Sequence, residues 1–434
     1  MKRLLLGLLL LIVAVAVAYA ILNRTDSAAG TAPSIAGAPP SADTLARGEY
    51  LAKAADCVAC HTVMGSDKAF AGGVAFRLPF GTIYSSNITP DPDTGIGRWS
   101  DDEFVRALRE GVRKDGEHLY PAFPYTSYTQ MSRADALAIK AYLFSVPAIK
   151  QANLANDLHF PFNQRWGMGF WNAAFFKSQR FAADSSKPPQ WNSGAYLATG
   201  LGHCAECHTP RNVGFGLEHG KELAGEELQG WRAYNITSDK EHGIGTWSDG
   251  ELAAYLKSGH AQGHASADGP MGEAVSNSLQ FLNDEDIASL VSYLRSVPAR
   301  EGKHPIEINH QPSPTMASTD ALPGPNEAQA HTQGLKLFEG ACASCHQWNG
   351  KGLETEYASL LGTRGVNDVT GTNVTQAILQ GVNLRVAGNS VFMPAFATAY
   401  SDAEISALAN YVIAHFGGKE GSVTPDEVAK RRSL

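Results

Sequence analysis

Short amphipathic segments alternate with polar stretches rich in Gly and Pro along most of the chain, a pattern typical of small helical domains. Three of these segments begin at a residue suited to cap a helix and carry a Tyr ten residues later. The starts are Ser132, Asn283 and Ser401, and the matching tyrosines are Tyr142, Tyr293 and Tyr411. Three shorter helices are expected upstream, beginning near Gly48, Gly194 and Gly334. The pattern therefore predicts one helical unit that occurs three times.

The first residues follow a different pattern. Lys2 and Arg3 precede an uncharged run of 19 residues from Leu4 to Leu22. At about 1.5 Å per residue the run makes roughly 28 Å of helix, close to the thickness of a bilayer core. We expect an uncleaved anchor, with the basic residues in the cytoplasm and the bulk of the chain outside. The alternative that this segment is a cleaved signal peptide stays open, because a signal peptidase could cut at Ala18-Tyr19-Ala20.

Composition and net charge indicate a folded chain and exclude one class of partner. The chain has 434 residues, of which 44% are hydrophobic and 18% charged, so it can bury a core. Lys and Arg number 35 against 43 Asp and Glu, a net charge of −8. This balance argues against nucleic acid as a partner, because nucleic acid requires a basic surface.

The six cysteines carry the chemistry. They form three Cys-x-x-Cys pairs, each followed at once by His, which is the attachment signature of c-type haem. A zinc half-site or a thiol redox pair would not explain a His after every pair with no cysteine left over. The sequence predicts three covalently bound haem c groups. The attachment residues are Cys57, Cys60, Cys204, Cys207, Cys342 and Cys345, and the iron ligands next to them are His61, His208 and His346.

The second axial ligand of each iron decides whether the haem is a relay or a catalyst. Methionine closes the iron, and three methionines precede the capped helices at suitable positions: Met131, Met271 and Met393. Met393 lies in a Met-Pro segment, whereas Tyr120 occupies the corresponding place in the first unit. The alternatives are His118 for the first iron, and His260 or His264 for the second.

The first two units share a further block. Asn87-Ile88-Thr89 is followed by Gly95-Ile96-Gly97 and Trp99, and Asn235-Ile236-Thr237 by Gly243-Ile244-Gly245 and Trp247. The polar residues could donate hydrogen bonds to haem propionates, or the block could be a loop that leads into a capped helix. Both interpretations stay open. The third unit keeps only Asn373-Val374-Thr375, so it is a more distant copy.

Together these residues resemble the membrane-associated triheme cytochrome c subunit of periplasmic dehydrogenase complexes. The resemblance runs from about residue 45 to 417 and rests on the three Cys-x-x-Cys-His sites, the doubled block and the Met-Pro segment. Relatives in that family serve quinoprotein alcohol dehydrogenases and flavin-dependent gluconate or sorbitol dehydrogenases. The resemblance implies an electron carrier, not an enzyme, that passes electrons from the large dehydrogenase subunit to ubiquinone or to a downstream cytochrome or oxidase. It also implies an inner-membrane location with the haem domains in the periplasm.

Two other functions stay open: a haem enzyme of the peroxidase or nitrite reductase type with one open iron, and a cytochrome subunit of a terminal oxidase. The expected fold is all-α, with three tandem cytochrome c-like domains after an N-terminal membrane segment. An aromatic linker either staples the first two domains together or faces a partner, and the charged tail is expected to fray. The expected boundaries are 1–26 for the signal anchor or signal peptide, 27–44 for a flexible linker, 45–150 for domain 1, 151–185 for the aromatic linker, 186–300 for domain 2, 301–328 for a second linker, 329–418 for domain 3 and 419–434 for the tail.

Overall fold

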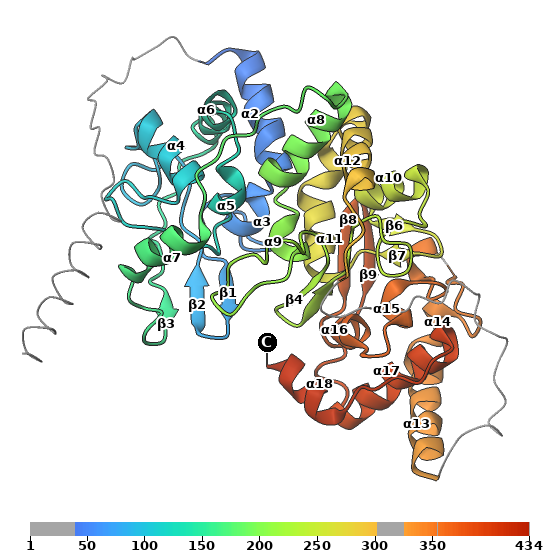
Figure 1. Ribbon diagram of the computed structural model, residues 1–434. Helices are drawn as coiled ribbons and strands as arrows, with labels where there is room; N and C mark the ends of the chain where they lie inside the picture. The colour runs from blue at the N-terminus through green and yellow to red at the C-terminus, as the bar shows by residue number, and fades with distance from the viewer. Residues whose placement is uncertain (1–39, 302–324, 354, 434) are drawn as a thin grey trace, which may run out of the picture. The chain divides into compact units, whose positions relative to one another are not determined.

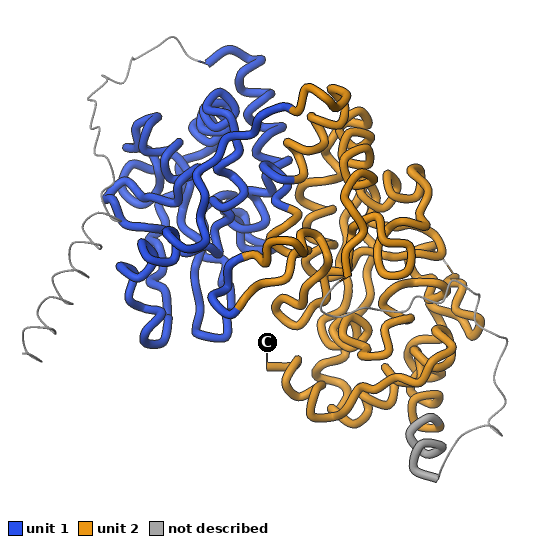
Figure 2. The backbone as a smooth tube through the Cα atoms, viewed as in Figure 1, with its two compact units in different colours: residues 1–183, 199–203, 213–216 blue, residues 184–198, 204–212, 217–434 orange. Residues whose placement is uncertain are grey.

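The computed structural model describes residues 40–301, 325–353 and 355–433, with the side chains of 325–331 left out (Figure 1). The chain divides into two compact units, coloured separately in Figure 2. Unit 1 runs to Ala183 and includes Thr199–His203 and Val213–Gly216. Unit 2 comprises Asp184–Ala198, Cys204–Asn212 and the chain from Leu217 on, so it holds the second and third haem motifs.

Unit 1 contains the first haem motif and a small antiparallel sheet. Its helices are α2 (Ala42–Ala54), α3 (Cys57–His61), α4 (Asp101–Glu110), α5 (Tyr125–Tyr128), α6 (Arg133–Leu143) and α7 (Gly167–Phe175). The sheet has the order β1 (Ala75–Leu78), β2 (Gly81–Tyr84), β3 (Asp157–Leu158). Phe76 pairs with Ile83, and Thr82 pairs with Asp157.

Unit 2 contains helices and three two-stranded hairpins. The helices are α8 (Pro189–Tyr196), α9 (Ala205–His208), α10 (Asp249–Ser258), α11 (Gly269–Asn277), α12 (Asp284–Ser296), α13 (Pro325–Ala341), α14 (Ala343–His346), α15 (Arg364–Asn367), α16 (Thr372–Gln380), α17 (Asp402–Gly417) and α18 (Pro425–Arg432). The hairpins are β4 (Glu226–Leu228) with β5 (Trp231–Ala233), β6 (His260–Ala261) with β7 (Ala265–Ser266), and β8 (Val382–Val386) with β9 (Asn389–Met393). A π-helical turn, Leu197–Leu201, follows α8, and short 3₁₀ turns occupy Leu279–Phe281 and Glu356–Ala358.

A pair of packed helices recurs three times: α2 with α6, α8 with α12, and α13 with α17. The helices expected to begin near Gly48, Gly194 and Gly334 begin earlier, at Ala42, Pro189 and Pro325. The three glycines lie instead inside the helices, at the crossings. A Cβ at Gly48 would overlap the carbonyl oxygen of Ala138, and one at Gly194 would overlap that of Ser289. Gly334 lies in the same way against Ala407. Glycine is required at each crossing because only a hydrogen lets the two backbones approach this closely.

The second helix of each pair begins where its cap was predicted. Ser132 accepts a hydrogen bond from the amide of Asp135, and Asn283 accepts one from that of Asp286. Ser401 forms a complete capping box with Glu404. These starts could be predicted because a cap depends on residues within one helical turn.

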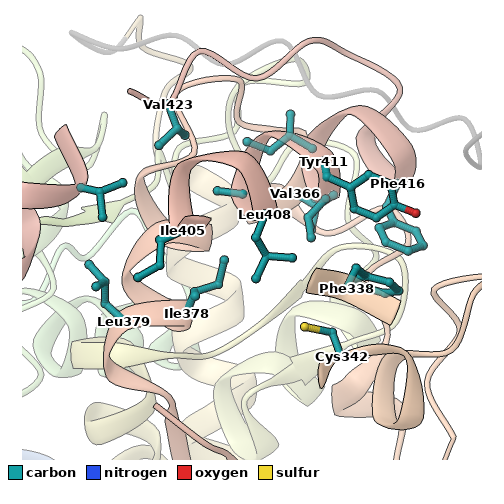
Figure 3. Close-up of a cluster of buried hydrophobic side chains, with 14 residues drawn as sticks. Phe338, Cys342, Val366, Ile378, Leu379, Ile405, Leu408, Tyr411, Phe416 and Val423 are labelled. Atoms are coloured by element: carbon teal, nitrogen blue, oxygen red, sulfur yellow. The ribbon is translucent and has the colours of Figure 1, made fainter. Parts of the chain in front are cut away.

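A cluster of buried hydrophobic side chains lies around α13 and α17 (Figure 3). Phe338 contacts the rings of Tyr411 and Phe416 with centroid distances of 5.5 and 5.2 Å. Cys342 lies at the edge of this cluster next to Phe338 (Figure 3). A haem attached at Cys342 would therefore extend an apolar core that the chain already provides.

The expectation of an all-α chain after an N-terminal membrane segment is wrong. Strands β1 to β9 form four small sheets. In the β8–β9 hairpin, Ala387 and Gly388 both have positive φ, as the tight turn between paired strands demands. Among the described residues no helix is long and apolar enough to cross a membrane. The apolar run from Leu4 to Leu22 lies outside those residues.

The charged tail forms a helix instead of fraying. Thr424 and Glu427 make a capping box at the start of α18, and Val428 is fully buried. Arg431 donates hydrogen bonds to the carbonyl of Gly230 at 2.9 Å and to Thr372 Oγ1 at 3.0 Å. Arg432 donates to the carbonyl of Tyr400 at 3.0 Å and lies 2.8 Å from Asp402 Oδ1. The buried Val428 and these two arginines thus dock a segment whose composition favours solvent.

The aromatic linker packs in part against unit 1. Phe162 stacks on Phe80 with centroids 4.4 Å apart, and Trp171 Nε1 donates a hydrogen bond to the carbonyl of Gly214 at 2.8 Å. Phe160 and Trp166 remain 79% and 54% exposed. Phe162 and Trp171 therefore contact other residues of unit 1, although Phe162 is itself 42% exposed.

Candidate haem sites

Each Cys-x-x-Cys-His motif folds into a single helical turn: α3, α9 or α14. In the second motif the amide of His208 donates to the carbonyl of Cys204 at 3.0 Å, and in the third the amide of His346 donates to that of Cys342 at 2.9 Å. Two thiols three residues apart on one turn lie on the same face, with the His directly after them. This arrangement suits attachment to one edge of a porphyrin.

Each of the three motif histidines forms the same kind of hydrogen bond, from its Nδ1 atom to a backbone carbonyl. His61 Nδ1 lies 2.7 Å from the carbonyl oxygen of Ser86, His208 Nδ1 2.6 Å from that of Tyr234, and His346 Nδ1 2.7 Å from that of Ala358. A carbonyl can only accept, so each Nδ1 carries the proton. Nε2 is then the unprotonated nitrogen, which is the form that binds a metal.

Burial also favours the neutral form of the three motif histidines. It lowers the pKa of His61, His208 and His346, and the carbonyl at Nδ1 opposes this only in part. Neutral imidazole is the form that binds iron. Burial also raises the pKa of the Cys57 thiol to about 12 and that of Cys204 to about 11. The residues present therefore fit a haem c group at each motif.

The doubled block positions the first two of these carbonyls, because Ser86 and Tyr234 directly precede its Asn residues. Asn87 Oδ1 accepts from the Thr89 amide at 2.9 Å and from Thr89 Oγ1 at 2.7 Å, while its Nδ2 donates to the carbonyl of Ile149 at 2.7 Å. The second copy makes the same bonds: Asn235 accepts from Thr237 and donates to the carbonyl of Arg300. These donors serve the loop, so the structure favours the loop interpretation over propionate binding by Asn and Thr.

The Trp end of the block is tied to the closing helix in both copies. Lys140 Nζ donates to the Trp99 carbonyl at 2.8 Å and lies 2.7 Å from Asp101 Oδ1. In the second copy Arg295 donates to the Trp247 carbonyl and lies 2.8 Å from Asp249. The same pair of contacts therefore occurs in both copies of the block, made by Lys140 in the first and by Arg295 in the second.

The three predicted methionine ligands lie in different surroundings. Met131 is fully buried just before α6. Met393 ends β9 and packs against the cluster that contains Cys342. Met271 lies in the first turn of α11 and packs against a smaller cluster of Ala267, Val275 and Leu384. The pairing of Met131 with His61, of Met271 with His208 and of Met393 with His346 stays a prediction.

The alternative histidine ligands differ from one another. The Nε2 atoms of His118 and His260 are buried without a hydrogen-bond partner among the described residues. Their Nδ1 atoms lie 3.1 Å from Asn172 Nδ2 and 2.9 Å from Ser266 Oγ. His264 is less suitable, because its Nε2 lies 3.4 Å from Glu251 and its ring stacks on Trp247.

Sequence reasoning missed the carbonyls that orient the histidines. A carbonyl belongs to every residue, so no residue type marks it. The available signal is position: Ser86 and Tyr234 each directly precede the Asn of a repeated block, 25 and 26 residues from their histidines. A loop repeated at that spacing predicts a shared structural task.

Comparison with known proteins identifies the family. The model of the cytochrome c family, described as "Cytochrome c", matches three segments of the chain, 45–147, 194–298 and 332–414, and each contains one haem motif. The chain belongs to the cytochrome c family. As a cytochrome with three such segments, it carries three covalently bound haem c groups.

Several relatives of this cytochrome have a similar length. It is 39% identical over 403 residues to the fructose dehydrogenase cytochrome subunit of Gluconobacter japonicus, covering 90% of this chain and 83% of the relative. It is 35% identical to the gluconate 2-dehydrogenase cytochrome c subunit of Pantoea cypripedii, over 89% of both chains. It is 34% identical to the cytochrome c subunit of the quinone alcohol dehydrogenase of Gluconobacter oxydans, over 90% of this chain and 82% of the relative.

Proposed function

We propose that this cytochrome is the electron-transfer subunit of a periplasmic dehydrogenase complex that oxidises an alcohol, an aldehyde or a sugar acid. It receives electrons from a quinoprotein or flavoprotein large subunit and passes them to ubiquinone or to a downstream cytochrome or oxidase. One observation carries the proposal: all three motif histidines are fixed in the tautomer that binds iron, in a chain whose relatives are named as cytochrome subunits of dehydrogenases.

The protein residues hold and orient the haems, and the substrate is oxidised elsewhere. In the proposed sites the six motif cysteines would form the thioether links, and His61, His208 and His346 would bind the iron. Met131, Met271 and Met393 would be the further iron ligands and would exclude water. When bound, haem c would supply one-electron exchange.

The proposal is tested on the purified holo-chain. Mass spectrometry should find three covalent haems, and the oxidised spectrum should be low-spin throughout. Mixed with the dehydrogenase encoded by the neighbouring reading frame and its substrate, the haems should be reduced, and a soluble ubiquinone analogue should reoxidise them. A substantial high-spin fraction that binds cyanide would support the haem-enzyme alternative instead. Reduced haems that quinone leaves unchanged but a soluble cytochrome reoxidises would redirect the acceptor while keeping the electron-transfer role.

A further inference from the structure

Arg364 is a buried cation that joins the second and third cytochrome c segments within unit 2. It begins α15 in the third segment and is 4% exposed. Its guanidinium donates to the carbonyls of Asn235, at 2.9 Å, and of Gly243, both in the doubled block of the second segment. Its amide donates to the carbonyl of His264 at 2.9 Å. A residue of one segment therefore reaches into the haem-binding loop of another.

Tyr234 connects this guanidinium to a motif histidine. The guanidinium carbon lies 5.8 Å from the centroid of the Tyr234 ring and 5.7 Å from that of Trp247. The carbonyl of Tyr234 is the group that accepts from His208 Nδ1. One residue thus separates the cation from the proposed iron ligand.

Among the described residues, no carboxylate lies within ion-pair distance of Arg364. Its Nε and the Tyr234 hydroxyl are buried without hydrogen-bond partners in that part of the chain. Arg232, another buried arginine of unit 2, instead pairs with Asp368 at 2.8 Å. Burial lowers the pKa of Arg364 to about 10, which leaves it protonated at neutral pH, and the charge of Asp239 opposes this shift from beyond ion-pair distance. A buried cation without a paired carboxylate is costly unless a further group uses its field.

We propose that Arg364 raises the reduction potential of the haem held by Cys204, Cys207 and His208, so that the third segment sets the potential of the second haem. The inference rests on the proposed haem ligands. Reduction of ferric haem adds one electron and removes one unit of positive charge, so a nearby cation favours the reduced form. The low dielectric of the interior strengthens this effect, whereas a surface arginine would be screened. Arg364 is thus a positioning and tuning residue, with no bond to iron.

The test compares three holo-proteins by potentiometric titration of the haem absorbance. Arg364→Gln keeps hydrogen-bond donors but removes the charge. It should lower one of the three potentials by about 59 mV, which is a tenfold change in a one-electron equilibrium constant. That component should be the one that His208→Met alters. Arg385→Gln is the control for the loss of an arginine charge, because Arg385 lies at an exposed position of β8 in the same third segment. It should leave all three potentials in place.

Arg364→Lys distinguishes the effect of the positive charge from the effect of the hydrogen bonds that join the two segments. Lysine keeps the charge and loses the forked contacts, so the potential should stay near that of wild type while the thermal midpoint falls. A potential that falls together with the midpoint in Arg364→Lys, or three unchanged potentials in an Arg364→Gln protein with three haems, overturns the inference. If Arg364→Gln does not fold, the lysine variant alone decides. A wild-type protein with fewer than three haems would overturn the proposed function and this inference together, whereas an unshifted Arg364→Gln protein overturns only the latter.

Discussion

His61 Nδ1 lies 2.7 Å from the carbonyl oxygen of Ser86, a residue 25 positions further along the chain. The acceptor is a backbone atom, so only the path of the loop can place it. That path is fixed by Asn87, which is 2% exposed and bonds Thr89 and the carbonyl of Ile149. Asn87 therefore orients an imidazole that it does not touch.

Replacing Asn87 tests this indirect role. Asn87→Ala leaves the buried Thr89 amide without its acceptor and leaves the Ile149 carbonyl only the longer bond from Thr89 Oγ1, so stability should fall by about 1–3 kcal/mol. The low-spin electron paramagnetic resonance signal of one haem should also broaden or shift, because the ring of His61 loses its fixed orientation. Asn163→Ala, at an exposed position of the aromatic linker, is the control and should change neither measurement. Lost stability with three unaltered haem signals would limit Asn87 to holding the loop.

The haem motifs and the capped helices could be predicted because each is a local pattern of residue types. The three glycines were expected to open helices, and only the folded chain shows that they lie at helix crossings. The role of the doubled block could not be predicted, since its working atoms are the carbonyls of Ser86 and Tyr234, which no side chain identifies. The same holds for Arg364, because its partners lie 129 and 121 residues away and only the folded chain brings them together. The hairpins were not expected because a haem core favours helices, although Val382–Val386 alternates apolar and polar residues as a strand does.

The helix crossings predict a sharp contrast within one helix. Gly334 and Gly340 both lie in α13, but a Cβ at Gly334 would overlap the carbonyl of Ala407, whereas one at Gly340 has nothing within 4 Å. Gly334→Ala should lower the free energy of unfolding by about 1–3 kcal/mol through overpacking. Gly340→Ala should be neutral or stabilising by up to about 1 kcal/mol, because alanine favours the helix. Thermal unfolding of the holo-protein, followed by near-ultraviolet circular dichroism, measures both. Equal effects would mean that α13 and α17 do not cross at Gly334.

Substitutions can decide whether Met131 or His118 is the sixth ligand of the first haem iron. Met131 is fully buried, and the rival His118 has a buried Nε2 without a partner among the described residues. Met131→Ala should convert one haem in three to a high-spin form of lower potential, because sulfur no longer closes the iron. His118→Ala should leave all three haems low-spin. If the two variants exchange these results, the first iron has two histidine ligands and a lower potential than the proposal requires.

The cap of α17 should make the third segment sensitive to acid. Glu404 accepts from the amide of Ser401 at 2.8 Å and from its hydroxyl at 2.7 Å, and these bonds lower the pKa of the Glu404 carboxyl below its ordinary value. A carboxyl whose pKa is lower in the folded state stabilises the fold above its unfolded pKa of about 4.3. That contribution is lost as the pH falls through the folded pKa. Glu404→Gln should therefore lower the thermal midpoint at neutral pH and flatten its decline as the pH falls below about 4.3. Glu285→Gln, in the exposed first turn of α12, should keep the wild-type decline. If the two variants decline alike, the acid sensitivity arises outside the Ser401–Glu404 cap.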